Sequence, residues 1–315
     1  MLRFLVGPTA SGKSDLALAV AEAAGWELLS MDSMQVYRGM DVGTAKPDAA
    51  MRARVPHHLL DLVGPQAEFD VTEWLRAAER TLERLAARGR TALFVGGTAF
   101  YLKALVQGLF DGPDVDEALR AELEQRARDL GPVALHAELA AVDPRSAERL
   151  HPHDVRRVVR GLEVWRQTGR TLSDWQREWH PGDARPAGRP HRILGLRAPV
   201  EELDRRIRAR CRAMLDGGWP EEARAIREGP GFSATSRQAL GYAEVLRMLD
   251  GELDREACEE AIGLRTRQFA RRQRTWLRGF AGIDWLPAPT SGERAATPER
   301  IAAALAVLEP EGASG

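Results

Sequence analysis

The sequence contains little cysteine and no long apolar segment, and each absence argues against a class of protein. The two cysteines, Cys211 and Cys258, are far apart and form no Cys-x-x-Cys pair, so neither a disulfide framework nor a zinc finger is indicated. No apolar run approaches the roughly twenty residues that span a bilayer. No cationic segment followed by an apolar one opens the chain. We therefore expect a cytoplasmic protein with no membrane partner.

Lysine is also scarce. Only three of the 45 basic residues are lysine (Lys13, Lys46 and Lys103), and the rest are arginine. Lysine and arginine differ in shape and hydration, so a lysine that stands out against this background is informative. All three lie in segments that other features single out below. The 315 residues, 44% of them apolar, suffice for one large α/β domain with an insertion or for two domains.

Residues 7–14 form a complete phosphate-binding loop. The loop follows an apolar run at 2–6 and precedes a helix-like stretch at 15–22, which is the context that the motif requires. Its backbone N–H groups and the positive end of the helix dipole would bind phosphate oxygens. Lys13 would reach the terminal phosphates, and the Ser14 hydroxyl would bind Mg²⁺. The predicted phosphate-binding residues are Gly7, Pro8, Thr9, Ala10, Ser11, Gly12, Lys13 and Ser14.

Short apolar runs bounded by turn residues alternate with helical patterns. The runs predict buried parallel strands at Phe4–Val6, Leu28–Ser30, Ala92–Val95 and Ile193–Leu196, and one of the helices is expected at Val71–Ala87. This alternation predicts an α/β fold, a P-loop NTPase-like parallel sheet flanked by helices, with an all-helical insertion.

The pattern also predicts a division of the chain. Residues 1–115 and 191–288 would form the P-loop core with its C-terminal helices, and residues 116–180 a helical insertion domain. A linker rich in proline, glycine and arginine at 181–190 would return the chain to the sheet. Residues 289–315 would form a C-terminal helix, with Thr297 as N-cap and Pro298 at its first position, followed by a tail.

Three polar segments directly follow predicted strands and should meet at one cleft: the phosphate-binding loop, residues 32–35 and residues 96–98. Ligands of such sheets bind beyond the carboxyl ends of the strands. Asp32 could bind Mg²⁺ through water or act as a general base, but it could equally form a turn or cap a helix. Thr98 could orient a phosphate or the Asp32 carboxylate, or cap the helix that follows.

Two arginine-rich stretches, at 151–160 and 262–282, stand apart from the rest. The second carries six arginines and no acidic residue, with aromatic residues between them. This composition favours a surface for RNA or polyphosphate over a merely solvated face. The adjacent histidines His57 and His58 favour packing or substrate positioning over a metal site, because neighbouring side chains point apart and no third ligand is evident.

Taken together in their order along the chain, the segments described above resemble those of the isopentenyl-diphosphate (IPP) transferase family. The bacterial members of this family are tRNA dimethylallyltransferases. The resemblance runs from Leu2 to about Leu286. It rests on residues 7–14, 32–47, 56–61, 96–105, 151–164, 237–242 and 271–279, which include all three lysines.

The resemblance implies a reaction that the motifs alone do not give. A dimethylallyl group would pass from dimethylallyl diphosphate to the exocyclic amino group of the adenosine 3′ to the anticodon, in tRNAs that read codons beginning with U, with release of diphosphate. The implied partners are the tRNA anticodon stem-loop and dimethylallyl diphosphate, and the implied cofactor is Mg²⁺ at Ser14. The protein is expected to be a monomer.

The resemblance also assigns residues. Asp32 would be the general base, Thr98 would lie near both the diphosphate and the base, and Arg210 would clamp the diphosphate, with Arg206 as a close competitor. The implied tRNA-binding residues are Asp32, Ser33, Met34, Gln35, Thr98, Arg120, Arg156, Arg157, Val158, Val159, Arg160, Arg237, Gln238, Gly241, Tyr242, Arg271, Arg272, Gln273, Arg274, Trp276 and Arg278. The adenine would leave its stack to react.

Three alternatives stay open from the sequence. In a P-loop small-molecule kinase, Asp32 would deprotonate a substrate hydroxyl. A second alternative is a prenyltransferase for free nucleotides, and a third is an RNA-binding protein that only senses nucleotide. The long arginine-rich helical regions weigh against a compact kinase.

Overall fold

A computed structural model describes residues 1–108, 112–177, 189–290 and 293–309. The chain forms two compact units, residues 1–106 with 189–315, and residues 107–188. Most of the linker predicted at 181–190, and the predicted tail from 310 onward, lie outside the described residues. No helix within the described ranges is both long and apolar enough to cross a membrane.

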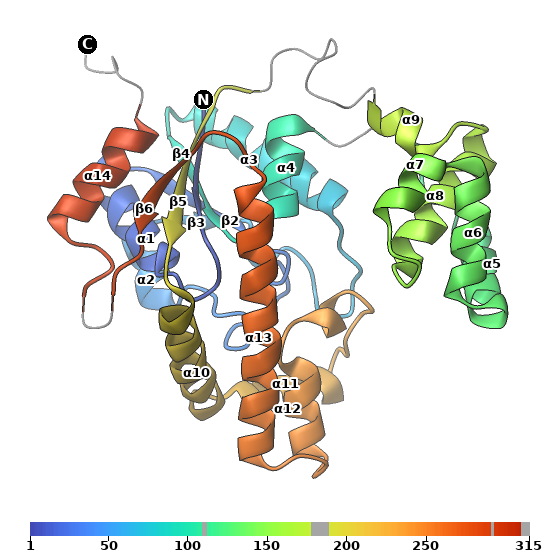
Figure 1. The fold of residues 1–315 in the computed structure, drawn as a ribbon. Helices are drawn as coiled ribbons and strands as arrows, with labels where there is room; N and C mark the ends of the chain where they lie inside the picture. Colours follow the sequence, from blue (N-terminus) through green and yellow to red (C-terminus); the bar gives the residue numbers. More distant parts are fainter. Residues whose placement is uncertain (109–111, 178–188, 291–292, 310–315) are drawn as a thin grey trace. The chain divides into compact units, whose positions relative to one another are not determined.

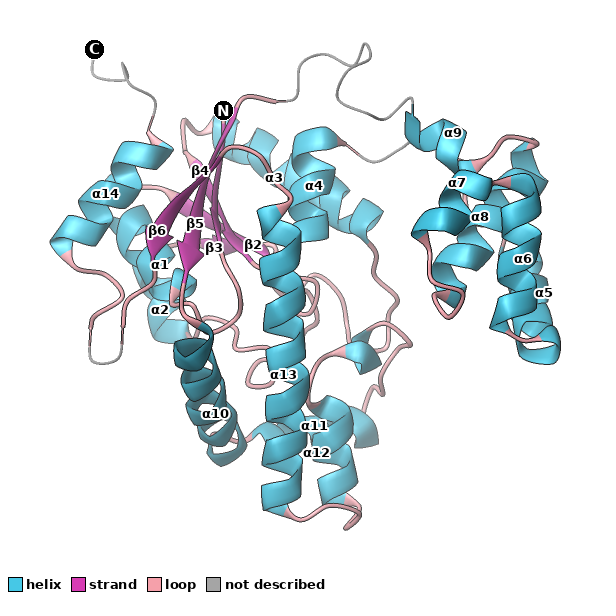
Figure 2. Ribbon diagram, in the orientation of Figure 1, coloured by secondary structure: helices cyan, strands magenta, loops and turns pink. Residues whose placement is uncertain are grey.

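The first unit is built around a six-stranded sheet in the order β3-β2-β4-β1-β5-β6 (Figures 1 and 2). Every neighbouring pair of strands is parallel. The strands are β1 (Leu2–Val6), β2 (Glu27–Met31), β3 (His57–His58), β4 (Ala92–Gly96), β5 (His191–Arg197) and β6 (Ile283–Pro287).

Helices cover both faces of this sheet, because side chains alternate along each strand and both faces are apolar. Phe4 and Val6 pack on one face with Trp74 and Tyr101, whereas Leu5 packs on the other with residues of the first and last helices. The helices of this unit are α1 (Lys13–Ala24), α2 (Ala49–Arg54), α3 (Val71–Ala87), α4 (Ala99–Gln107), α10 (Val200–Asp216), α11 (Trp219–Glu228), α12 (Tyr242–Leu249), α13 (Arg255–Arg278) and α14 (Pro298–Leu308), with a 3₁₀ turn at Ser236–Gln238.

The second unit consists of helices around its own small core in the part of the chain that the structure describes. Leu123, Leu139, Val158 and Leu162 are buried together there. Prolines begin two of the helices, Pro132 after Gly131 and Pro144 after Asp143. The helices are α5 (Glu117–Leu130), α6 (Pro132–Val142), α7 (Pro144–Arg149), α8 (Val155–Thr168) and α9 (Leu172–Arg177).

The parallel α/β fold and its four predicted strands are confirmed, but two edge strands were not predicted. The first, β3, consists only of His57 and His58, for which no strand was predicted. Two residues are too few to show an alternating pattern. The other, β6, ends in Pro287 and is only partly buried, as suits an edge strand. The predicted cap of the last helix is confirmed, since the Thr297 side chain accepts a hydrogen bond from the Arg300 N–H.

Candidate functional site

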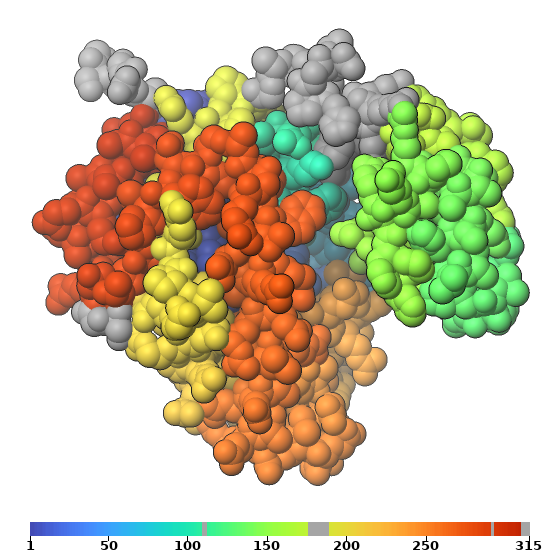
Figure 3. Space-filling view, in the orientation of Figure 1, coloured from blue at the N-terminus to red at the C-terminus, as the bar shows by residue number. Residues whose placement is uncertain are grey.

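A large cavity of about 1190 Å³ opens at the carboxyl edge of the sheet. The three polar segments predicted to meet at one cleft all line it, together with residues of α10 and α13. Figure 3 shows the hollow between the yellow residues of α10 and the orange residues of α13, with blue N-terminal residues at its floor. This convergence follows from the topology, since β1, β2 and β4 are adjacent and parallel.

The phosphate-binding loop joins β1 to the N-terminus of α1. Gly12 precedes the helix with a φ of 82°, a left-handed conformation that glycine adopts without steric cost. Ala10 has a φ of 62°, so the loop holds a conformation that is uncommon for a residue with a side chain. Ser11 is fully buried, and its hydroxyl has no hydrogen-bond partner among the described residues. The loop therefore presents backbone donors at a helix N-terminus, as an anion site requires.

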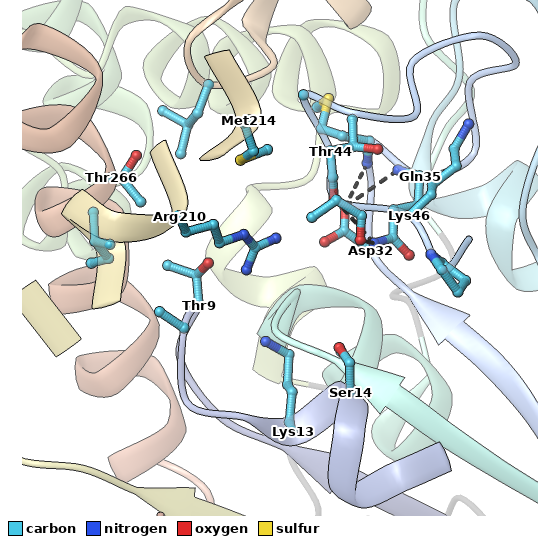
Figure 4. Close-up of a pocket in the computed structure, with 18 of the residues that line it drawn as sticks. Thr9, Lys13, Ser14, Asp32, Gln35, Thr44, Lys46, Arg210, Met214 and Thr266 are labelled. Atoms are coloured by element: carbon cyan, nitrogen blue, oxygen red, sulfur yellow. Dashed lines mark hydrogen bonds between the residues drawn. The ribbon is translucent and has the colours of Figure 1, made fainter. Parts of the chain in front are cut away.

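Two cations point into the cavity from opposite sides. In Figure 4 the Arg210 guanidinium lies between Thr9, Lys13 and Asp32. Burial and the positive charge of Arg210 lower the pKa of Lys13 to about 8, although Asp32 opposes this shift. Burial also lowers the pKa of Arg210. An anion bound between these groups would relieve their mutual repulsion.

Arg206 and Arg210 occupy different surroundings although they are one helical turn apart on α10. The Arg206 guanidinium donates to Glu202, to the Ala10 carbonyl and to the Pro289 carbonyl. In the described part of the chain the Arg210 guanidinium has no hydrogen bond. Arg210 is thus available to an incoming anion. Arg206 instead binds the phosphate-binding loop through the Ala10 carbonyl.

Asp32 directly follows β2 and faces the cavity with one carboxylate oxygen. Its Oδ1 accepts hydrogen bonds from the Met34 and Gln35 N–H groups at 2.9 and 3.4 Å. Asp32 therefore does form a turn, which is one of the roles left open by the sequence. The turn occupies only Oδ1, and Oδ2 accepts no hydrogen bond from any residue that the structure describes. One side chain can fill both roles, because the turn fixes the orientation of the second oxygen.

Thr98 ties the segment after β4 to the segment after β2. Its Oγ1 accepts a hydrogen bond from the Ser33 N–H at 3.3 Å, and its N–H donates to the Met31 carbonyl. Its carbonyl accepts from the first turn of α4. Thr98 therefore positions the Asp32 segment as well as lining the cavity.

Gln35 and Lys46 are occupied with the protein itself. The Gln35 side chain bonds the Ser30 hydroxyl and the carbonyls of Thr44 and Ala45. Lys46 is buried and donates to the Tyr37 carbonyl, to Asp41 and to Asp61. The loop that carries Thr44 and Ala45 forms one wall of the cavity, so these contacts shape the site. Contact of the Gln35 carboxamide with tRNA, which the resemblance implies, would require these bonds to break.

Glu222 on α11 is a site-shaping residue that the sequence analysis missed. Its carboxylate accepts the N–H groups of Asp41, Val42 and Gly43 at 2.6, 2.7 and 3.0 Å, and the Tyr242 hydroxyl at 2.6 Å. A single glutamate far along the chain carries no local pattern that could have revealed this. Lys46, in contrast, was marked by the scarcity of lysine.

The predicted RNA-contact side chains divide into exposed and buried groups. Within the first unit, Arg237, Gln238, Arg271, Arg272, Trp276 and Arg278 are exposed, and Arg274 is half-buried. Tyr242 and Gln273 are buried, and so are Val158 and Val159 in the second unit. Each of these four side chains exposes 6% of its surface or less, so they offer little area for contact with RNA in this conformation. The valines face the core of their own unit because hydrophobic burial decides the orientation of α8.

Two of the four arginines predicted to bind RNA in the second unit pair with a buried carboxylate. Glu163 is fully buried and pairs with Arg120 at 2.8 Å and with Arg160 at 3.2 Å. Arg157 pairs with Asp154, and Arg156 is exposed. Arg120 and Arg160 thus stabilise their own unit, which leaves Arg156 and Arg157 as its exposed cations among those predicted.

No cluster of three or more His, Cys, Asp or Glu side chains that could hold a metal occurs in the described ranges. The paired histidines fit the packing role expected of them, with His57 bonded to the Val55 carbonyl and His58 to Glu27. Oxygen donors at or near the phosphate-binding loop include the Ser14 hydroxyl and the free Asp32 oxygen. This set suits Mg²⁺, because the ion usually keeps several water ligands and binds through few protein oxygens together with the phosphates of a substrate.

Two family models match the chain, one described as IPP transferase over residues 35–280 and one as isopentenyl transferase over residues 1–57. A tRNA dimethylallyltransferase of Geobacter sulfurreducens is 43% identical over 300 residues, covering 94% of each chain. One from Anaeromyxobacter dehalogenans is 46% identical over 286 residues, covering 90% of this chain and 92% of the relative.

Solved structures give the same result. A full-length tRNA isopentenylpyrophosphate transferase from Bacillus halodurans has a TM-score of 0.65 and 34% identity, covering 91% of this chain and 89% of that one. A eukaryotic dimethylallyltransferase acting on tRNA has a TM-score of 0.76 and 28% identity, covering 91% of this chain and 73% of that one.

Proposed function

The chain belongs to the IPP transferase family, and we propose that it transfers a dimethylallyl group from dimethylallyl diphosphate to tRNA. The acceptor is the exocyclic amino group of the adenosine 3′ to the anticodon in tRNAs that read codons beginning with U. The observation that carries the proposal is the meeting of Lys13, Arg210 and Asp32 around one cavity. This arrangement supports the proposal because cations suited to a diphosphate lie opposite a carboxylate that could accept a proton from an amine.

The bond that breaks joins the allylic carbon to the diphosphate oxygen, and the bond that forms joins the same carbon to the adenine nitrogen. Lys13, Arg210 and the backbone donors of the phosphate-binding loop stabilise the charge that develops on the leaving diphosphate. The amine is conjugated to the purine ring and is a weak nucleophile. The free Asp32 oxygen accepts its proton as the new bond forms.

We further propose that Mg²⁺ binds with the donor. The Ser14 hydroxyl and the oxygens of the diphosphate would hold the ion, with water completing its shell. When bound, Mg²⁺ supplies further charge neutralisation to the leaving group. We also propose that the protein acts as a cytoplasmic monomer, since the lining of the cavity is drawn from the first unit alone and tRNA is a cytoplasmic substrate.

The small-molecule kinase is the less favoured alternative, because the relatives are tRNA dimethylallyltransferases. The two activities are separated by their products. Mass spectrometry of unmodified tRNA incubated with the protein and dimethylallyl diphosphate should show the addition of one dimethylallyl group, with diphosphate released only when tRNA is present. Release of ADP from ATP without RNA, and no change in the tRNA, would instead support the kinase.

A further inference from the structure

Gln273 occupies the boundary between the phosphate-binding loop and the segment that follows β4. Its side-chain Oε1 accepts a hydrogen bond from the Thr9 N–H at 2.8 Å, and its Nε2 donates to the Gly97 carbonyl at 3.0 Å. The residue is only 6% exposed, although it belongs to the arginine-rich part of α13. Each end of one carboxamide is therefore bonded to a different wall of the cavity.

The contact at Gly97 is too close for any other residue. A Cβ at this position would lie 2.1 Å from the Gln273 Nε2, well inside the distance at which atoms repel. Any side chain at position 97 would therefore displace the Gln273 carboxamide from its present position. Loss of the carboxamide would leave the Thr9 N–H and the Gly97 carbonyl as polar groups without a partner, which costs more than the hydrogen bonds themselves.

The two groups that Gln273 joins stand next to the groups proposed to react. Thr9 lines the cavity beside Lys13, in the loop that would bind the diphosphate. Gly97 precedes Thr98, whose hydroxyl bonds the Ser33 N–H next to Asp32. The Gln273 carboxamide thus sets the separation between the site of the leaving group and the site of the base.

We propose that Gln273 is a positioning residue for the transfer reaction and not an RNA contact. The inference rests on the proposed function. The amine, the allylic carbon and the diphosphate oxygen have to lie in line, and a displacement of about 1 Å in such an arrangement can cost about a hundredfold in rate. Gln273 holds the alignment because it supplies one donor and one acceptor at a fixed distance.

The variant Gln273→Glu tests this directly. A protonated carboxyl has nearly the same shape as the carboxamide and can make the same two hydrogen bonds, with one O–H donor and one carbonyl acceptor. An ionised carboxylate offers only acceptors and faces the Gly97 carbonyl with like charge. We expect the ratio of wild-type to Gln273→Glu kcat to rise with pH, approaching about tenfold per pH unit above the carboxyl pKa until residual activity limits it. A ratio that does not change with pH would overturn the proposal.

The variant Gln273→Met separates alignment from folding and from RNA binding. It keeps the length of the side chain and adds no charge. We expect a loss of about 10- to 100-fold in kcat, with the Kd for tRNA within about twofold of the wild type. The matched control is Gln66→Glu, at an exposed loop residue, which should keep the wild-type kcat and pH profile. Circular dichroism at each pH should show the same folded fraction for all variants.

Two results would contradict the inference while leaving the proposed function intact. Unchanged kcat in Gln273→Met would remove the positioning role. A higher Kd for tRNA with unchanged kcat would show that Gln273 is an RNA contact. Failure of the wild-type protein to modify tRNA would instead contradict the proposed function itself, so the two failures cannot be confused.

Discussion

Lys13 carries its charge at the expense of stability. Burial and Arg210 lower its pKa to about 8 from the ordinary value of 10.5. Because the folded pKa lies below the unfolded one, the unfolded chain binds more protons between these values. The unfavourable contribution is therefore fully present below pH 8 and disappears as the pH rises through 10.5.

Lys13→Met should consequently be more stable than the wild type at neutral pH. It removes a buried cation next to another cation and keeps the apolar stem. Urea unfolding at pH 7 should give a higher midpoint for the variant, and the difference should shrink between pH 8 and 10.5. Isothermal titration with inorganic diphosphate should show loss of binding in the same variant. A variant that is less stable at pH 7 would contradict this account of Lys13.

Asp32 should lose catalysis without losing structure when it is changed to asparagine. The carbonyl oxygen of the introduced carboxamide can still accept from the Met34 and Gln35 N–H groups, as Asp32 Oδ1 does, but the side chain cannot take a proton. We expect kcat for the Asp32→Asn variant to fall by at least about two orders of magnitude, in the range for loss of a general base. The melting temperature and the Kd for tRNA should stay close to those of the wild type. Normal turnover would show that another group removes the proton.

At the scale of an element, the loop from Asp41 to Pro47 is held by Glu222 on α11, which accepts hydrogen bonds from three backbone N–H groups at the start of the loop. Glu222→Gln replaces one acceptor oxygen by a donor group that faces either backbone N–H groups or the Tyr242 hydroxyl. We expect a loss of about 2 kcal/mol in the free energy of unfolding, in the range for hydrogen bonds to charged groups, measured by chemical denaturation. The adjacent exposed residue provides the control, since Glu221→Gln should change stability by less than about 0.5 kcal/mol. Equal losses in the two variants would remove the special role of Glu222.

The helix α13 has two different faces, with Gln273 buried at the cavity and arginines exposed to solvent. Arg271→Ala removes one of the exposed cations. We expect weaker binding of tRNA and a slope of log Kd against log salt that is reduced by about 0.7 to 0.9, as for one lost phosphate contact. Arg80→Ala, at an exposed arginine of α3, should leave the slope unchanged. An unchanged slope in Arg271→Ala would show that Arg271 does not contact tRNA.

The elements show where sequence reasoning succeeds and where it ends. The four predicted strands are all interior strands of the sheet, where continuous apolar runs reflect burial on both faces. The edge strands β3 and β6 are short or half-exposed and leave no such run. The phosphate-binding loop and Asp32 were found because their chemistry is local. The partners of Glu222 and Gln273 were not, because backbone groups far away in the chain complete these contacts.

Charge on a helix was also a poor guide to which face is exposed. The arginine-rich stretches were assigned to RNA as whole segments. Within these stretches the structure turns Gln273 toward the cavity and pairs Arg160 with the buried Glu163, which also pairs with Arg120 from outside them. Arginine stabilises a buried carboxylate as readily as it binds a phosphate, and composition does not distinguish the two.

At the scale of the molecule, the two units have separate cores. A variant in which a flexible glycine-serine linker replaces residues 112–186 should therefore fold, because no core residue of the first unit is removed. We expect it to bind inorganic diphosphate with the wild-type affinity but to bind tRNA at least about tenfold more weakly, since Arg156 and Arg157 are lost. Circular dichroism and calorimetry would check folding and diphosphate binding. Wild-type affinity for tRNA would show that the second unit does not contribute.

The bond between the Thr9 N–H and Gln273 also has a consequence for biosynthesis. It joins residues 264 positions apart, so the phosphate-binding loop leaves the ribosome long before its partner on α13. Domains generally fold as their N-terminal parts emerge, yet this loop cannot reach its final form until α13 has followed. A nascent chain stalled before that helix would therefore carry the complete phosphate-binding motif and still be unable to use it.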